Sequence, residues 1–448
     1  MQWQHYEQEA RARGVKLDFA DFIPPRIPDA ENFASIPVFE ACAQAVDRGQ
    51  KAPQPFELPK LAIGVNPEGS DAQGQKPIKL VAWQVYFFET KMLPAISDNA
   101  PADVLKALKK FDAPLNELRE AARRPHCRFP IHWKKGAEMP QFTLLQGATR
   151  IYALRLNAHL AMGDSAAAAA NFHDAIALVQ AIRHEPSAIA GLVRIAMDAM
   201  IQNAVWDGLA TRRWKEADLR LIEADLARLD WLDDDRFSMA SERALCNSTT
   251  DKMSRRFKAD LFHFKGGGDS VDAIAKDSRP VPLIAWFYYL NKLGINRFFD
   301  ELSARAEPAQ HRWHGERPIS DARESIIGMF AHARYALFIL ITAPFEGVDA
   351  HFAHAAVMTD QTRLACALER CWLSRGEFPA TLAELAPEFI DRVPADVVNG
   401  EPYHYRRTND GSFVLYSVGS NLRDDGGVID PKLSSSRQPD WVWRYPAK

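Results

Sequence analysis

The segment "LLQGATRIYALRLNAHLAMGDSAAAAANFHDAIALVQAI", residues 144–182, decides the fold of this chain. Apolar residues recur in its first half at steps of three or four, which places them on one stripe of an α-helix. Gly163 suits the end of that helix, and Asp164 or Ser165 suits the first position of the next helix. The segment therefore predicts two helices joined by a tight turn. The stripe consists of Leu144, Ala148, Ile151, Leu154 and Ala158.

Further helices are predicted on the C-terminal side of this pair. "EPSAIAGLVRIAMDAMIQNAVWDGLA" (185–210) carries Pro186 where the first turn of a helix would be, and "WKEADLRLIEADLARL" (214–229) has the apolar spacing of another helix. This succession resembles a tetratricopeptide-type array of helical hairpins, although no period of about 34 residues repeats. We therefore expect residues 141–345 to form an all-α domain, an irregular helical-hairpin array.

The N-terminal part, residues 1–140, is predicted to be an irregular, proline-rich segment with a few helices. Four prolines in "DFIPPRIPDAENFASIP" (21–37) favour extended backbone, because proline fixes φ and restricts the residue before it. A helix is expected at 37–48. Turn-forming residues then make 51–77 a predicted loop.

The C-terminal part, residues 346–448, has a different pattern, typical of a small α+β module. A long helix is predicted from 348 to 374, with Gly376 at its end and Thr381 as the N-cap of a short second helix. Two alternating runs then flank Asp410-Gly411, a strong signal for a β-hairpin. The predicted fold class is mainly α: the irregular helical-hairpin array followed by this small module.

The composition narrows the class of protein. The chain has 448 residues, 47% of them hydrophobic, and a formal net charge of −3, which are the values of an ordinary globular protein. The balanced charge excludes a typical nucleic-acid binder, which would show a basic face. The polar start, "MQWQHYEQEARARG", is not a signal peptide, and no run reaches the ~20 apolar residues of a membrane span. The two longest apolar runs, 281–290 and 335–344, are predicted to be buried core helices, and the five cysteines are predicted to be buried free thiols.

An acidic loop follows the second predicted strand. "YSVGSNLRDDGG" (416–427) combines side-chain oxygens with two glycines, and calcium prefers six to eight oxygen ligands from such flexible loops. The alternative is a solvated turn, since Asp-Gly pairs are common turn chemistry. The predicted ligands of a structural Ca²⁺ are Asn421, Asp424, Asp425 and Asp430.

Histidines offer weaker candidates for chemistry. His311 and His314 form one pair at i, i+3 spacing, and His351 and His354 form another, but neither pair has a third metal ligand nearby in the sequence. Solvated or hydrogen-bonded histidines are the simpler interpretation. His126-Cys127 lacks an orienting carboxylate in the sequence, and no GxSxG motif is present. The sequence therefore identifies no catalytic residue.

The order of elements in the C-terminal module resembles a known family. A long helix, "GEFP", a short helix, "VPAD", a hairpin and an acidic "SVG" loop are similar to the globular domain of type II secretion major pseudopilins, and this resemblance implies calcium in the acidic loop. Over its whole length the chain is similar to uncharacterised envelope proteins of verrucomicrobial and planctomycete genomes. The segments that carry this likeness are "DFIPPRIPD", "LACALERCWLSRGEFPATL", "YRRTNDGSFVLYSVG" and "DWVWRYP".

The resemblance implies a function that the residues alone do not. We expect a non-catalytic, exported envelope protein with a structural or protein-interaction role, an unknown protein partner and no nucleic acid. The envelope family implies a membrane anchor just before the segment at Trp3 to Tyr6, absent from this chain. The alternative is a hydrolase-type enzyme with its site in the helical domain. A cleft holding a histidine and a carboxylate would favour the enzyme, and a groove with exposed apolar residues would favour the interaction protein.

Overall fold

The fold was obtained as a computed structural model of the chain. The structure is 61% helix and 6% strand. It is therefore mainly helical with small sheets, which confirms this part of the predicted fold class. The likeness of the C-terminal module to pseudopilins stays a prediction. The structure describes residues 2–58, 77–130, 139–263, 282–317, 335–430, 432–433 and 437–444.

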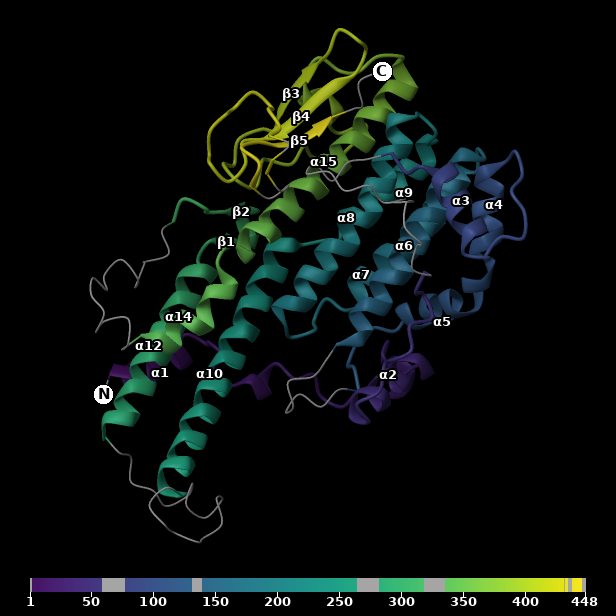
Figure 1. The fold of residues 1–448 in the computed structure, drawn as a ribbon. Coiled ribbons are helices and arrows are strands. Elements are labelled where there is room, and N and C mark those ends of the chain that lie inside the picture. Colours follow the sequence, from purple (N-terminus) through teal and green to yellow (C-terminus); the bar gives the residue numbers. More distant parts are fainter. Residues whose placement is uncertain are drawn as a thin grey trace.

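Long helices form most of the described structure, and short 3₁₀ turns lie between several of them (Figure 1). The α-helices are α1 (Gln2–Ala12), α2 (Pro37–Asp47), α3 (Leu80–Glu89), α4 (Ala100–Leu108), α5 (Asp112–Ala122), α6 (Pro140–Ala161), α7 (Ser165–Ala181), α8 (Ala188–Ala210), α9 (Glu216–Leu226), α10 (Trp231–His263), α12 (Pro282–Ser303), α14 (Ala336–Thr342) and α15 (Val348–Arg375). The 3₁₀ turns are η1 (Phe19–Asp21), η2 (Asp29–Glu31), η3 (Lys109–Phe111), η4 (Pro308–Gln310), η5 (Ala343–Phe345) and η6 (Leu382–Leu385).

The turn between α6 and α7 matches its prediction. Gly163 has a φ of +81°, the left-handed conformation that glycine adopts without strain, and the Asp164 side chain accepts a hydrogen bond from the Ala167 N–H at 3.0 Å. The prediction for Pro186 is wrong, because α8 begins two residues later with Ser187 as its N-cap. The Glu242 carboxylate of α10 also accepts from the Ala188 N–H at 2.7 Å, so α8 begins where two side chains satisfy its free N–H groups.

Helix α15 is the central element of the fold. It packs against α8, α9 and α10, and its described side chains are mostly buried (Figure 1). It ends at Gly376, with φ +80°, as predicted. One continuous hydrophobic cluster runs from Phe33 to Trp443 through this helix. The division of the chain at residue 345 stays a prediction, and apolar packing crosses it.

The C-terminal sheet lies against α15 and has the order β3-β4-β5. The strands are β3 (His404–Arg407), β4 (Phe413–Ser417) and β5 (Trp441–Arg444), all antiparallel. The predicted hairpin around Asp410-Gly411 is confirmed, and Gly411 has a φ of +74°. Thr381 caps the predicted short helix, which is the 3₁₀ turn η6. A two-stranded ribbon of β1 (Ala306–Glu307) and β2 (Arg312–Trp313) lies next to α10, and Trp313 packs against Trp441 of β5 with 6.4 Å between ring centres.

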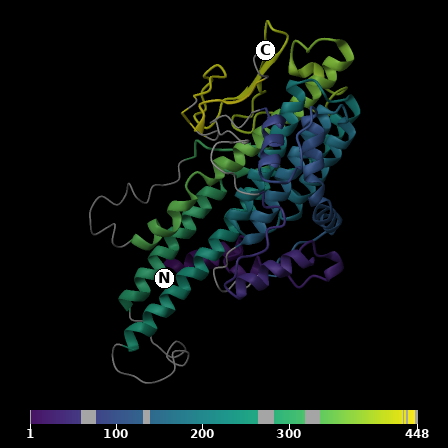
Figure 2. The same ribbon diagram turned by 45° about the vertical axis from the view of Figure 1, so that its right-hand side comes forward.

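Helices α10 and α12 extend away from the rest of the protein as an antiparallel pair (Figures 1 and 2). Here the prediction of buried core helices at 281–290 and 335–344 is wrong in part. Trp286 is 46% exposed and Tyr289 is 52% exposed on α12, and Leu340 is 70% exposed on α14. The reason is positional: of the described elements, α10, α14 and α1 pack against α12, and they leave these side chains exposed. Leu337 and Phe338 of α14 are buried as predicted.

Helix α8 has the length and apolar composition of a membrane span, although 56% of its most apolar window is buried inside the protein. It packs against α6 and α15. The same length and composition are found in the core helix of a water-soluble domain, so they do not distinguish the two environments. The packing of α8 is that of a core helix.

Candidate functional site

In the acidic loop after β4, one hydrogen bond joins two of the four predicted ligands. Asn421 donates its side-chain amide to the Asp425 carboxylate at 2.7 Å. Asp424 accepts from the Gly426 N–H at 2.9 Å and from the Tyr416 hydroxyl at 3.0 Å. These bonds lower the pKa of Asp424, the backbone bond contributing most, so its carboxylate stays charged.

The structure places a further carboxylate beside this loop that the sequence does not predict. Asp440, just before β5, is buried and accepts from the Gly427 N–H at 2.7 Å and from the Asp425 N–H at 3.3 Å. Burial raises the pKa of Asp440, and the nearby charges of Asp425 and Asp424 act in the same direction. Only the pairing of β5 with β4 brings Asp440 to the loop. The one sequence signal was its place directly before an alternating strand.

Asp430 makes its hydrogen bonds with residues other than the predicted ligands. Its carboxylate accepts from the Lys432 N–H at 2.9 Å, and its own N–H donates to Gln438 at 2.8 Å. Among the described residues no hydrogen bond joins Asp430 to the other ligands, and no group of three or more His, Cys, Asp or Glu side chains has the arrangement of a metal site. Calcium takes carbonyl and amide oxygens as well as carboxylates. The calcium site therefore stays a prediction.

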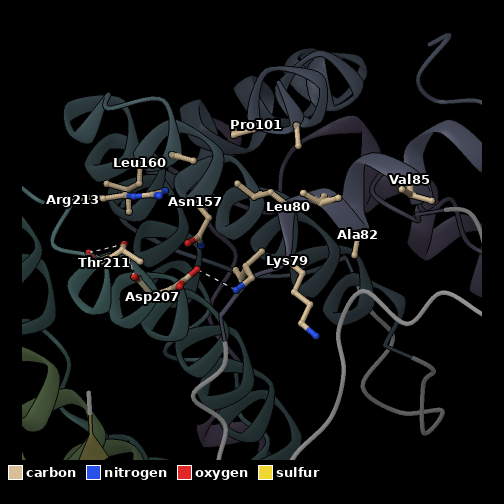
Figure 3. A pocket seen from close by; sticks show the side chains of 15 residues that line it. Lys79, Leu80, Ala82, Val85, Pro101, Asn157, Leu160, Asp207, Thr211 and Arg213 are labelled. Atoms are coloured by element: carbon tan, nitrogen blue, oxygen red, sulfur yellow. Dashed lines mark hydrogen bonds between the residues drawn. The ribbon is translucent and has the colours of Figure 1, made fainter. Parts of the chain in front are cut away.

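An apolar groove runs between α3, α4, α6 and α8 (Figure 3). It has a volume of about 700 Å³ and is lined largely by aliphatic side chains, among them Leu80 and Val85. Val81 is 65% exposed at its edge. Its polar lining residues are Lys79, Asn157, Asp207, Thr211 and Arg213. Asp207 accepts from the Ile78 N–H at 3.1 Å, and Figure 3 shows the Lys79 side chain directed away from Asp207. The sequence does not predict this groove, because residues from four helices that are distant in the chain line it together.

A charged cleft of about 820 Å³ lies between the proline-rich segment, the end of α5, α7 and α9. His173 of α7 meets Asp225 of α9 there, with 2.8 Å between Nδ1 and a carboxylate oxygen. Arg228 lies 3.4 Å from the same Asp225 carboxylate. The sequence does not predict this His173–Asp225 dyad, because its two residues are 52 positions apart in the chain.

Cys127 lines the same cleft beside the buried Glu185. Both carboxyl oxygens of Glu185 are buried without a hydrogen-bond partner among the described residues. Burial alone raises the pKa of Glu185 to about 8, so this carboxyl is protonated at neutral pH. Burial also raises the pKa of the Cys127 thiol, which makes it a poor nucleophile. The other four cysteines are buried free thiols, as predicted, whereas Cys127 is half-buried.

The paired histidines each have hydrogen-bond or packing partners. His311 lies 2.8 Å from the Asp360 carboxylate, and His314 lies between Glu307 and Glu316 at 3.1 and 2.9 Å. The Nδ1 of His351 lies 2.9 Å from the carbonyl oxygen of Gly347, the residue just before α15. His354 is packed edge-on against Trp441, and burial lowers its pKa to about 4. These contacts agree with hydrogen-bonded or core histidines.

A comparison with known proteins finds no matching family model, no matching curated protein and no matching solved structure.

Glu185 generates a prediction about pH. Its carboxyl keeps its proton in the folded protein up to about pH 8, whereas in the unfolded chain it ionises near pH 4. The folded state therefore binds the extra proton between these values, and stability falls as pH rises, by up to about 1.4 kcal/mol per pH unit. We expect Glu185→Gln to flatten the fall in unfolding free energy between pH 5 and pH 8, measured by urea titration.

Glu120→Gln is the matched control for this experiment, because Glu120 is exposed and paired with Arg123. It should leave the pH dependence of stability as in the wild type. An equal pH dependence in Glu185→Gln and the wild type would contradict a buried, protonated Glu185.

Proposed function

We propose that this chain is a non-catalytic protein of the cell envelope that binds another protein through the apolar groove between α3 and α8. The observation that carries the proposal is the groove itself, about 700 Å³ in volume and open to solvent along its aliphatic edge. The likeness of the whole chain to exported envelope proteins supports the location.

The chemistry of the groove suits an apolar helix of a partner protein. Amphipathic helices bind by laying their apolar face into a groove lined by side chains of this kind. Leu80, Val81 and Val85 supply that lining from one helix, and Leu160 supplies it from the opposite wall. Asp207 accepts from the Ile78 backbone N–H, and the basic residues Lys79 and Arg213 also line the groove, so a bound helix would meet polar groups at its edge as well as the apolar lining.

Amphipathic helical peptides selected from a display library should bind the wild-type protein, and Val81→Glu should weaken that binding by about tenfold or more. The reason is that a carboxylate in an apolar contact loses hydration without gaining a partner. Affinities of purified peptides would be measured by fluorescence anisotropy. Leu221→Glu is the control, since Leu221 is equally exposed on α9 but lies outside the groove. Equal affinities for both variants would contradict a docking role for the groove.

We also propose that the C-terminal module is stabilised by one Ca²⁺ in the acidic loop. Asp424, Asp425 and Asp440 bring negative charge to one end of the sheet, and the mutual repulsion contributes to the raised pKa of Asp440. A divalent cation would relieve that repulsion. Asn421 supplies a neutral oxygen, and backbone carbonyls and water would complete the shell that calcium requires.

Calcium should raise the melting temperature of the whole chain, because it binds only the folded loop. At a calcium concentration of a hundred times Kd, the folded state gains about 2.7 kcal/mol of stability. The double variant Asp424→Asn, Asp425→Asn should abolish this shift, measured by differential scanning calorimetry. Asp391→Asn, an exposed change elsewhere in the module, should keep it. Identical melting curves in calcium, magnesium and chelator would show that the loop is only a turn.

A second candidate function, hydrolysis, is favoured by one specific observation, the His173–Asp225 dyad in the charged cleft. An Nδ1–H donated to Asp225 leaves Nε2 as the acceptor that a general base needs. A panel of ester, phosphoester and peptide substrates tests this candidate. Turnover that falls at least about a hundredfold in His173→Ala, and not in His5→Ala, would establish it over the non-catalytic proposal.

A further inference from the structure

The end of the α10–α12 pair that holds residues 286–290 carries an unusual surface. From residue 286 to 290 helix α12 reads "WFYYL", and every one of these side chains is exposed or only half-buried. A helix that is apolar on all sides is normally buried in a protein core or in contact with lipid. The described residues do not bury this part of α12 in a core, and Trp286 and Tyr289 are 46% and 52% exposed, so its aromatic surface needs another explanation.

Contacts along the pair place basic residues beside these aromatic side chains. Asn247 of α10 and Asn296 of α12 exchange amide hydrogen bonds, and Asp251 pairs with Lys292 at 2.9 Å. The helices are antiparallel, so the residues that follow Asp251 in α10 lie level with those that precede Lys292 in α12. Three of these are exposed: Lys252, Met253 and Arg255.

The N-terminal helix lies at the same end of the pair. Trp3 of α1 packs over the Lys292 ammonium, 4.7 Å from its ring centre, and the Tyr6 hydroxyl donates to Asp300 at 2.8 Å. The beginning of α1 is therefore the part closest to the aromatic surface, and Figure 1 shows the N-terminus beside the lower part of α12.

We propose that this end of the α10–α12 pair binds the surface of a membrane rich in anionic lipid. Trp286 and Tyr289 enter the headgroup region, where aromatic rings with one polar atom are favoured. Lys252 and Arg255 face the lipid phosphates, and their attraction depends on the negative charge of the membrane. The inference rests on the envelope location proposed above, and it needs neither the groove nor the calcium loop.

Co-sedimentation of the full chain with vesicles tests the proposal. We expect binding to phosphatidylglycerol-containing vesicles, weaker binding to pure phosphatidylcholine, and loss of binding as salt is raised. The double variant Trp286→Ser, Tyr289→Ser should reduce partitioning by roughly tenfold. Ile189→Ser with Leu221→Ser removes two equally exposed apolar side chains from the body of the protein and should leave partitioning unchanged.

Charge is tested by a second pair of variants. Lys252→Glu with Arg255→Glu should abolish the preference for anionic vesicles, whereas Arg123→Glu with Arg220→Glu makes the same change in net charge away from the aromatic surface and should retain it. Thermal melting of each variant checks that it is folded.

Three outcomes would overturn the proposal. One is the absence of binding to any vesicle. Another is a loss of vesicle binding in the control variants equal to that in the variants of the aromatic and basic residues, which would indicate unspecific adsorption. The third is a wild-type dimer in solution that becomes monomeric in Trp286→Ser, Tyr289→Ser, since the surface would then be covered by a second copy of the chain. A calcium or peptide result does not bear on these outcomes, so failure here is distinguishable from failure of the proposed function.

Discussion

The structure depends on burying α15, a long helix that carries polar as well as apolar side chains on its covered faces. Each polar group taken from water must find a hydrogen-bond partner, or its burial is costly. Thr359 accepts from Trp231 of α10 at 3.0 Å and from Gln202 of α8 at 3.2 Å, while Gln361 donates to the backbone of Trp441 at 2.7 Å. These bonds fix the positions of α8, α10 and β5 around one helix, and they join the C-terminal sheet to the helical part.

The same constraint accounts for the charges inside the protein. Arg194 of α8 pairs with Asp234 of α10 at 2.8 Å, and Arg305 pairs with Asp349 of α15 at 3.1 Å. A buried pair of this kind adds little net stability, but removing one partner leaves an uncompensated charge in the interior. Such pairs therefore restrict which helices can neighbour one another. Among the residues that the structure describes, Glu185 has no such partner, and its carboxyl remains protonated instead.

The proposed activities use surfaces at the margins of this core. The apolar groove lies where α3 and α4 cover α6 and α8, the acidic loop lies at the end of the sheet, and the aromatic surface lies at the far end of the α10–α12 pair (Figure 1). A rigid core with separate surfaces suits a protein that binds several partners at once, such as another protein, a cation and a membrane. The charged cleft with its His173–Asp225 dyad favours chemistry instead.

Local signals in the sequence determined the mainly helical class, the turn at Gly163, the end of α15 at Gly376 and the hairpin at Asp410-Gly411, because each depends on neighbours within a few residues. They also placed Asn421, Asp424 and Asp425 in one loop. Only the tertiary structure decided that Asp440 joins them, that His173 meets Asp225, and that "WFYYL" is exposed instead of buried. The physical reason is that burial and side-chain pairing depend on which distant helices and strands pack together, and apolar periodicity does not specify the packing partner.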